Sequence, residues 1–202
     1  MDVKQYLSEW SECYRKDFVE NIMPFWMKNG LDRKHGGVYT CLDRDGTLMD
    51  TTKSVWFQGR FGFIAAYAYN NIEKNPEWLA ASKSCIDFIE AHCFDTDGHM
   101  FFEVMEDGTP LRKRRYVFSE GFAAIAMSEY SIASGDKTYA QKALDLCNRI
   151  MYMLDTPGFL APKYLDTMKS QGHSITMILV NTAARIRAAI DAPVLTEQID
   201  RS

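Results

Sequence analysis

The chain has 202 residues, a formal net charge of −4 and an apolar fraction of 47%, so it is long and apolar enough to form a sizeable globular core. Its slightly acidic balance gives no reason to expect nucleic acid or an anionic membrane as a partner. No apolar run approaches the roughly 18 residues of a membrane span, and the polar N-terminus lacks the apolar core of a signal peptide, which predicts a cytoplasmic protein.

The first predicted element is a long helix over residues 4–29, because apolar residues recur there at helical spacing. Pro24 is predicted to kink or end this helix, since proline has no N–H to donate within a helix. A short β-rich run over residues 36–42 follows, and Asp45-Gly46 comes soon after it. This combination predicts a β-hairpin.

Residues 54–71 predict a helix that is apolar on nearly all sides, and Asn75-Pro76 begins a second helix with an N-cap and a proline at the first helical position. Gly135 is the predicted C-cap of a later apolar helix. The same cycle is predicted a second time, with a hairpin over residues 99–108, an apolar helix over 116–134 and an amphipathic helix over 137–154. A third apolar helix is predicted over residues 174–190.

A repeat of about 62 residues organises these elements, because Asp45-Gly46-Thr47 recurs as Asp107-Gly108-Thr109. A fixed period of this size is typical of stacked units that cannot bury their apolar faces alone. Each unit pairs a nearly all-apolar helix with an amphipathic one, as two concentric rings of helices require. The sequence therefore predicts an all-α toroid of helix pairs with short β-hairpins at one rim. About three units form a single domain over residues 1–202.

Polar and aromatic residues that open the inner helices are predicted to line the central cavity. Tryptophan and tyrosine beside arginine, glutamine and glutamate are typical of sugar sites, because aromatic faces stack on sugar C–H groups while polar groups bond the hydroxyls. Three groups stand at comparable places in the repeat: Lys53, Trp56, Gln58 and Arg60; Arg115, Tyr116, Ser119 and Glu120; Lys169, Gln171 and His173.

Each of these residues also has a structural interpretation. Arg60 and Glu120 could form an internal ion pair, Trp56 could belong to the core, and His173 could cap its helix. The five cysteines are scattered and show no metal-ligand spacing, so we expect no metal site.

Three segments together resemble the N-acylglucosamine 2-epimerase family, which includes cellobiose 2-epimerases and aldose–ketose isomerases. They are Trp56 to Arg60, Tyr116 to Phe122 and Gly172 to Leu179. The resemblance covers almost the whole chain and keeps the order of the motifs. It implies an (α/α)6 barrel of six helix pairs, of which this chain holds the N-terminal half.

The resemblance implies chemistry at the carbon next to a sugar carbonyl. A base removes the C2 proton, an enediolate forms, and reprotonation on the other face gives the epimer, as between N-acetylglucosamine and N-acetylmannosamine. Arg60 is then the substrate-polarising arginine, and His173 an active-site histidine. The residues predicted to contact the substrate beside them are Lys53, Trp56, Gln58, Tyr116 and Glu120. No cofactor is implied, although modulation by a nucleotide stays open.

The chain departs from the family in its length, because members are considerably longer and carry paired catalytic histidines in their second half. A half toroid also exposes inner helices along an open edge. Three explanations stay open: a fragment, a truncated gene product, or a protomer that closes the ring as a homodimer.

Four alternative functions also stay open. The enzyme could be an aldose–ketose isomerase or a cellobiose 2-epimerase. It could be a glycoside hydrolase or lyase that uses Glu120 and Asp166, or the chain could be an inert sugar-binding or protein-interaction domain.

Overall fold

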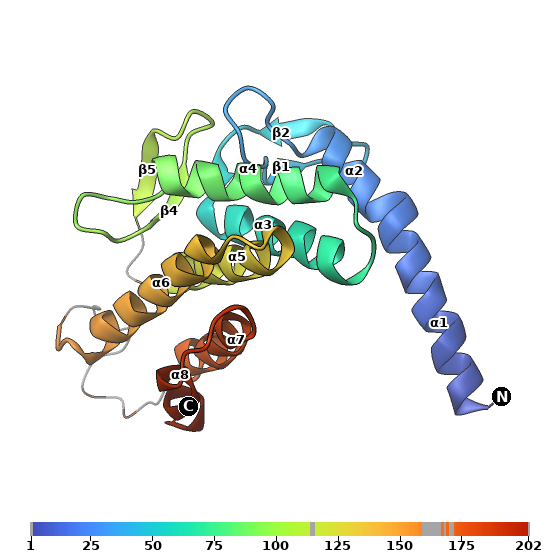
Figure 1. Cartoon of the computed structure of the whole chain (residues 1–202). Coiled ribbons are helices and arrows are strands. Elements are labelled where there is room, and N and C mark those ends of the chain that lie inside the picture. The colour runs from blue at the N-terminus through green and yellow to red at the C-terminus, as the bar shows by residue number, and fades with distance from the viewer. Residues whose placement is uncertain (1, 114–115, 159–166, 168, 170–171, 202) are drawn as a thin grey trace.

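The computed structural model describes residues 2–113, 116–158, 167, 169 and 172–201, without the side chains of 198–201. Helices dominate this part of the chain, and two small sheets lie together at one side of it (Figure 1). One helix extends away from the rest of the chain at the N-terminus. Among the described residues, no helix has both the length and the hydropathy that a membrane span needs.

The N-terminal helix continues through Pro24 instead of ending there. It consists of α1 (Val3–Asp17), one π-helical segment η1 (Phe18–Ile22) and α2 (Met23–Asn29). Proline cannot donate to the helical ladder, and the wider π turn just before it accommodates this loss. Helix α1 buries none of its residues, and its apolar side chains are exposed to solvent.

The strands form two antiparallel sheets. The first holds β1 (Cys41–Leu42) and β2 (Leu48–Asp50), as the first predicted hairpin requires. The second has the order β3-β4-β5, and its strands are β3 (Lys53–Ser54), β4 (Phe101–Val104) and β5 (Pro110–Lys113). Strand β3 was not predicted, and it ties the start of the helix that follows it to the second hairpin.

The remaining helices are α3 (Val55–Asn71), α4 (Pro76–His92), α5 (Phe118–Ser134), α6 (Lys137–Asp155), α7 (Ser174–Ala189) and α8 (Val194–Arg201). The predicted caps are present. The Asn75 side chain accepts from the Glu77 N–H, and Gly135 ends α5 in the left-handed conformation. Helix α8 was not predicted, and it packs against α7.

Helices α3 and α5 cross at very short range. A Cβ atom on Gly59 would lie 2.6 Å from the carbonyl carbon of Phe122 and 2.7 Å from its Cβ. Glycine is therefore the residue that lets the two backbones approach here. The main apolar core spreads from this crossing across α4, α6 and α7.

The sequence repeat recurs in the tertiary contacts. The Gln58 side chain of α3 bonds the Val38 backbone, and the Glu120 side chain of α5 bonds the Met100 backbone, each across 20 residues of chain. Each hairpin is therefore held by a buried polar side chain from the inner helix that follows it. In this register Arg60 corresponds to Phe122 of the next unit, so Arg60 and Glu120 are not equivalent in the repeat.

Candidate functional site

An aromatic cluster lies where α3 and α5 begin. The half-buried Trp56 ring has its centroid 5.2 Å from that of Phe102, 5.3 Å from that of Phe118 and 5.7 Å from that of Phe122. Tyr116 extends the cluster, since its ring lies edge-on to Phe118 at 6.4 Å. Two helices and strand β4 thus contribute to one aromatic surface, which we call the aromatic cluster.

Two arginines flank the aromatic cluster. The exposed Arg60 guanidinium lies 4.1 Å from the Phe122 ring centroid and 5.7 Å from that of Trp56. Arg112 of β5 lies 5.3 Å from the Phe102 centroid. Stacking on aromatic faces orients a guanidinium while its N–H groups stay available. A fixed cation beside apolar ring faces can hold a polyol and stabilise negative charge on one of its oxygens.

Lys53 lies apart from this surface. Its side chain is fully buried, and Nζ donates to the Asp32 carboxylate at 2.7 Å and to the carbonyls of Gly36 and Glu106 at 2.8 Å each. These bonds use the three hydrogens of the ammonium group. Lys53 therefore joins the two hairpins, and its contacts leave no donor for a ligand.

The hydrogen bonds around Lys53 favour the charged form of the Asp32 carboxylate. Burial alone would raise its pKa, but the hydrogen bonds from Lys53 and from two backbone N–H groups outweigh burial and lower the pKa. Nearby Tyr39 has its pKa raised to about 12, by burial and by the Asp32 charge.

Gln58 and Glu120 are also fully buried, and they face the hairpins rather than solvent. Gln58 exchanges two hydrogen bonds with the Val38 backbone, and Glu120 accepts the Met100 N–H at 2.9 Å. Arg60, in contrast, is exposed. The alternative interpretation, an internal ion pair of Arg60 with Glu120, is thus not what holds either side chain in the structure.

His173 precedes α7 and is exposed, as is Lys169. The His173 carbonyl accepts the Met177 N–H at 3.0 Å, and its imidazole makes no capping hydrogen bond to α7. Of the other residues named from the sequence, Ser119 is buried and donates to the Phe101 carbonyl at 3.0 Å. Arg115, Asp166 and Gln171 lie outside the described residues.

Sequence reasoning assigned no role in this surface to three of its residues: Phe102, Phe118 and Phe122. A signal for Phe118 was available, because it occupies the same place in the second repeat unit as Trp56 does in the first. Phe102 and Arg112 belong to a hairpin that only the β3–β4 pairing brings to α3. In the part of the chain that the structure describes, no group of three or more histidine, cysteine or acidic side chains is arranged to hold a metal ion.

Comparison with solved structures identifies the fold. The chain resembles the cellobiose 2-epimerase from Spirochaeta thermophila with a TM-score of 0.84 and 20% sequence identity, over 99% of this chain and 54% of that one. The helix pairs described above therefore form about half of an (α/α)6 barrel, as predicted.

Comparison with curated proteins gives the same half-length match. N-acylglucosamine 2-epimerase of Rattus norvegicus is 28% identical over 91% of this chain, and cellobiose 2-epimerase of Eubacterium cellulosolvens is 29% identical over 74% of it. The match spans 45% of the rat protein and 37% of the bacterial one, so the chain covers less than half of these relatives.

The family model described as N-acylglucosamine 2-epimerase (GlcNAc 2-epimerase) matches residues 37–173, which include the aromatic cluster, Arg60 and His173. Because this match covers well over half of the sequence, the chain belongs to the N-acylglucosamine 2-epimerase family.

Proposed function

We propose that this chain forms one wall of the active site of a sugar 2-epimerase, which acts on N-acetylglucosamine or a related aldose. The observation that carries the proposal is the exposed Arg60 guanidinium fixed over the Phe122 ring beside Trp56, in a chain of this family. Relatives named as N-acylglucosamine and cellobiose 2-epimerases support the reaction class.

In the proposed reaction the open-chain sugar lies against the aromatic cluster, with its carbonyl oxygen toward Arg60. Removal of the C2 proton moves charge onto that oxygen, and a prepositioned guanidinium stabilises it where it develops. Proton transfer needs a base with a pKa near neutrality, which favours histidine. His173 is our candidate for ring opening or substrate contact within this chain.

The rest of the site must come from another half barrel. The chain covers less than half of its relatives, and the proposed base that completes proton transfer would lie in the matching half. A homodimer is the alternative partner. It would bring a second copy of the same wall, so we favour a complementary half of the toroid. No cofactor is invoked, and nucleotide modulation remains a separate question for binding assays.

The test begins with sugar binding. Titration with N-acetylglucosamine should change the tryptophan fluorescence, and Arg60→Ala should weaken binding by at least about tenfold, equivalent to about 1.4 kcal/mol. Arg44→Ala is the matched control, because Arg44 is an exposed arginine in the turn of the first hairpin. Unchanged affinity in Arg60→Ala would contradict the proposed site.

Isotope exchange tests the reaction itself. The same sugar is incubated in deuterated water with the chain, and C2 is followed by NMR. Deuterium at C2 that depends on Arg60 would indicate that this chain carries its own base. Binding without exchange is the result we expect of one wall alone. Competition with mannose and cellobiose then separates the epimerase proposal from the aldose–ketose isomerase and cellobiose epimerase alternatives.

A further inference from the structure

The two hairpins are held by side chains that occupy the same place in the repeat but differ in chemistry. Gln58 holds the first hairpin and Glu120 holds the second. An amide and an ionised carboxylate are not interchangeable, since the amide both donates and accepts while the carboxylate only accepts. Gln58 donates a hydrogen bond at its hairpin, and an ionised Glu120 could not donate one at the equivalent place.

The Gln58 amide uses both of its ends on one residue. The Val38 N–H donates to Oε1 at 2.8 Å, and Nε2 donates to the Val38 carbonyl at 2.6 Å. Both bonds are buried, and Val38 is itself buried in the hairpin. The amide therefore satisfies the donor and the acceptor of that backbone position at once.

Glu120 repeats only the first of these bonds. Its Oε1 accepts the Met100 N–H at 2.9 Å, and Met100 occupies the place in the second repeat unit that Val38 has in the first. The other oxygen, Oε2, is buried and has no hydrogen-bond partner among the described residues. An ionised oxygen without a partner in such a place is costly, whereas a protonated one becomes a donor.

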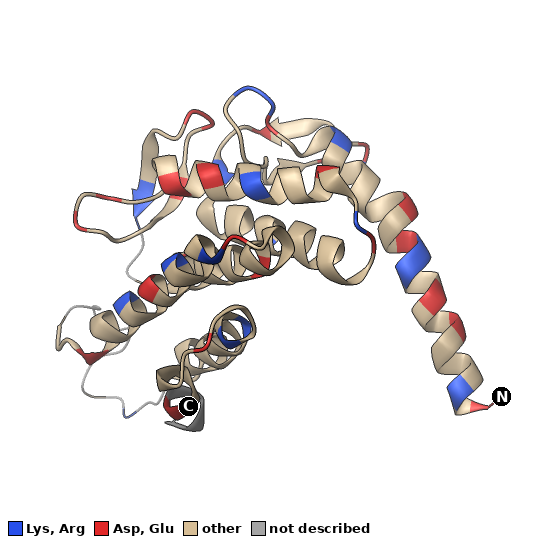
Figure 2. Cartoon of the chain, in the orientation of Figure 1, with Lys and Arg blue, Asp and Glu red and all other residues tan. Residues whose placement is uncertain are grey.

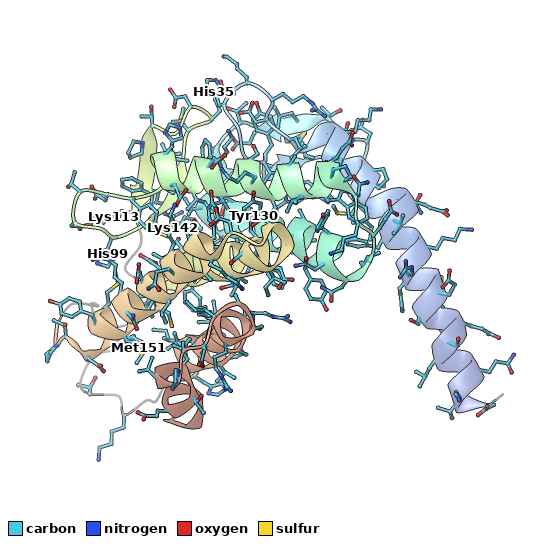
Figure 3. All side chains as sticks on the ribbon, in the orientation of Figure 1. His35, His99, Lys113, Tyr130, Lys142 and Met151 are labelled. Carbon is cyan, nitrogen blue, oxygen red and sulfur yellow. The ribbon has the colours of Figure 1, made fainter. Side chains whose placement is uncertain are left out.

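The charged groups around this carboxyl come from three elements. His99, in the loop before β4, lies with Nδ1 3.7 Å from Oε1, and Asp97 of the same loop opposes ionisation. Arg149 of α6 favours ionisation. Lys113 of β5 lies near His99 (Figure 3). Its charge is balanced by ion pairs with Asp97 and Asp95.

We propose that Glu120 is a neutral carboxylic acid in the folded protein at neutral pH, and that its Oε2–H takes the place of the Gln58 amide as donor to the Met100 carbonyl. Burial agrees with this assignment, because it raises the pKa of Glu120 more than three groups lower it: the backbone N–H of Met100, the backbone N–H of Glu120 itself and the Arg149 charge. Burial also lowers the pKa of His99, so the nearby imidazole tends toward its neutral form.

Glu120 would then be a positioning residue for the sugar site. Met100 is followed by β4, and Phe102 of that strand contacts Trp56 with ring centroids 5.2 Å apart. A neutral acid holds β4, and with it Phe102, against the aromatic cluster. This consequence rests on the function proposed above, whereas the protonation of Glu120 does not.

The first experiment measures stability without any sugar. A group whose pKa is raised on folding stabilises the protein below its ordinary pKa, and that stability is lost as the pH rises toward the folded value. Urea midpoints of the wild type should fall between about pH 5 and about pH 8 more than those of Glu120→Gln. Glu120→Gln should match the wild type near about pH 4 and exceed it at about pH 8.

Gln58→Glu is the matched variant, because it places an acid at the equivalent site of the first hairpin. It should acquire a new loss of stability over the same pH range. A lower midpoint of Glu120→Gln than of the wild type at about pH 8 would overturn the proposal, since it would mean that an ionised Glu120 is the stabilising form. Carbon-detected NMR titration of the Glu120 carboxyl provides a second readout, and an ordinary pKa there would also overturn it.

Sugar affinity separates the two proposals. With Phe102 held by a neutral acid, wild-type affinity for N-acetylglucosamine should weaken toward alkaline pH, and Glu120→Gln should remove that dependence. A flat wild-type profile together with a raised NMR pKa would contradict the positioning role but leave the protonation intact. Absence of any sugar binding would count against the proposed function alone.

Discussion

At the scale of single residues, burial decided which polar side chains are available to a ligand. Trp56 and Arg60 stand close to Lys53 in sequence, and they differ from it in exposure. Lys53 is closed off by its three internal acceptors, while Arg60 stacks on the Phe122 ring of the aromatic cluster. From the sequence, all three residues were predicted to contact the ligand, because residue type carries no information on burial.

Lys53→Met should destabilise the protein strongly. The change leaves the buried Asp32 carboxylate without its partner, and losing one member of a buried ion pair costs about 3–5 kcal/mol. The Asp32 pKa is lowered on folding, so the stability it contributes is present above the ordinary carboxyl pKa and is lost as the pH falls through the folded value.

Urea denaturation at neutral pH, repeated in acid, measures this effect. The difference between wild type and Lys53→Met should shrink as Asp32 becomes protonated in both proteins. Adding Asp32→Asn to Lys53→Met should recover part of the loss, because the amide carries no charge. A loss that is equally large in acid would contradict the ion-pair explanation.

Gly59→Ala should also lower stability, by about 1–3 kcal/mol, the usual range for overpacking. Alanine is the better helix former by about 1 kcal/mol, but its Cβ would meet the Phe122 backbone at 2.6 Å. Gly172→Ala is the control, because no atom of the residues that the structure describes lies within 4 Å of a Cβ there. Chemical denaturation of both variants decides the point, and a stabilised Gly59→Ala would mean that α3 and α5 can separate freely.

At the scale of elements, the second hairpin completes the candidate site. Strand β3 precedes α3 directly, and its pairing with β4 brings Phe102 to Trp56 and Arg112 to the same surface. The two residues of β3 thus connect the start of α3 with the hairpin of the second repeat unit. Charges of both signs are spread over α1, α4 and α6 (Figure 2).

Phe102→Ala should weaken N-acetylglucosamine binding by about tenfold, which corresponds to about 1.4 kcal/mol. The substitution removes a ring that packs on Trp56 and that carries Arg112 over its face. Fluorescence titration measures the change. Leu111→Ala is the control, because Leu111 belongs to the same hairpin and is exposed. Equal affinities for the two variants would exclude the hairpin from the site.

At the scale of the whole molecule, apolar side chains remain exposed at both ends of the described chain. Helix α1 projects away from the rest (Figure 1), and it exposes Leu7, Trp10 and Tyr14 along its length. Met177 and Val180 are exposed on α7. Contiguous exposed apolar surface is typical of an interface, and a half barrel is expected to have one such edge at each end.

The purified chain should therefore self-associate as its concentration rises. Leu7→Lys and Met177→Lys should reduce this association without lowering the thermal midpoint, because both side chains are exposed. Light scattering after gel filtration gives the native mass, with Leu111→Lys as the control on a hairpin. A monomer at all concentrations would show that these edges do not attract one another, and would count against the homodimer.

Local signals in the sequence were enough to predict the helix pairs, the hairpins and the repeat, because apolar spacing and turn residues act locally. Gly135 and Asn75 cap the predicted helices, and the positive φ values of Gly46 and Gly108 fall in the predicted turns. Of the two outcomes predicted at Pro24, a kink or an end of the helix, the end is wrong, because the helix continues and a π turn absorbs the missing donor.

Which of the candidate residues face outward could not be predicted in this way, because it depends on long-range contacts. The sequence predicted Lys53, Gln58 and Glu120 as site residues, because they are polar and lie near the start of inner helices. Each of them instead bonds the backbone of a hairpin that lies at least 20 residues away in sequence, and local patterns do not predict such contacts. Arg60 and Trp56 became one surface with Phe102 through the pairing of β3 with β4, two strands that belong to different repeat units. Burial and long-range pairing depend on the whole fold, and so does the availability of a side chain for chemistry.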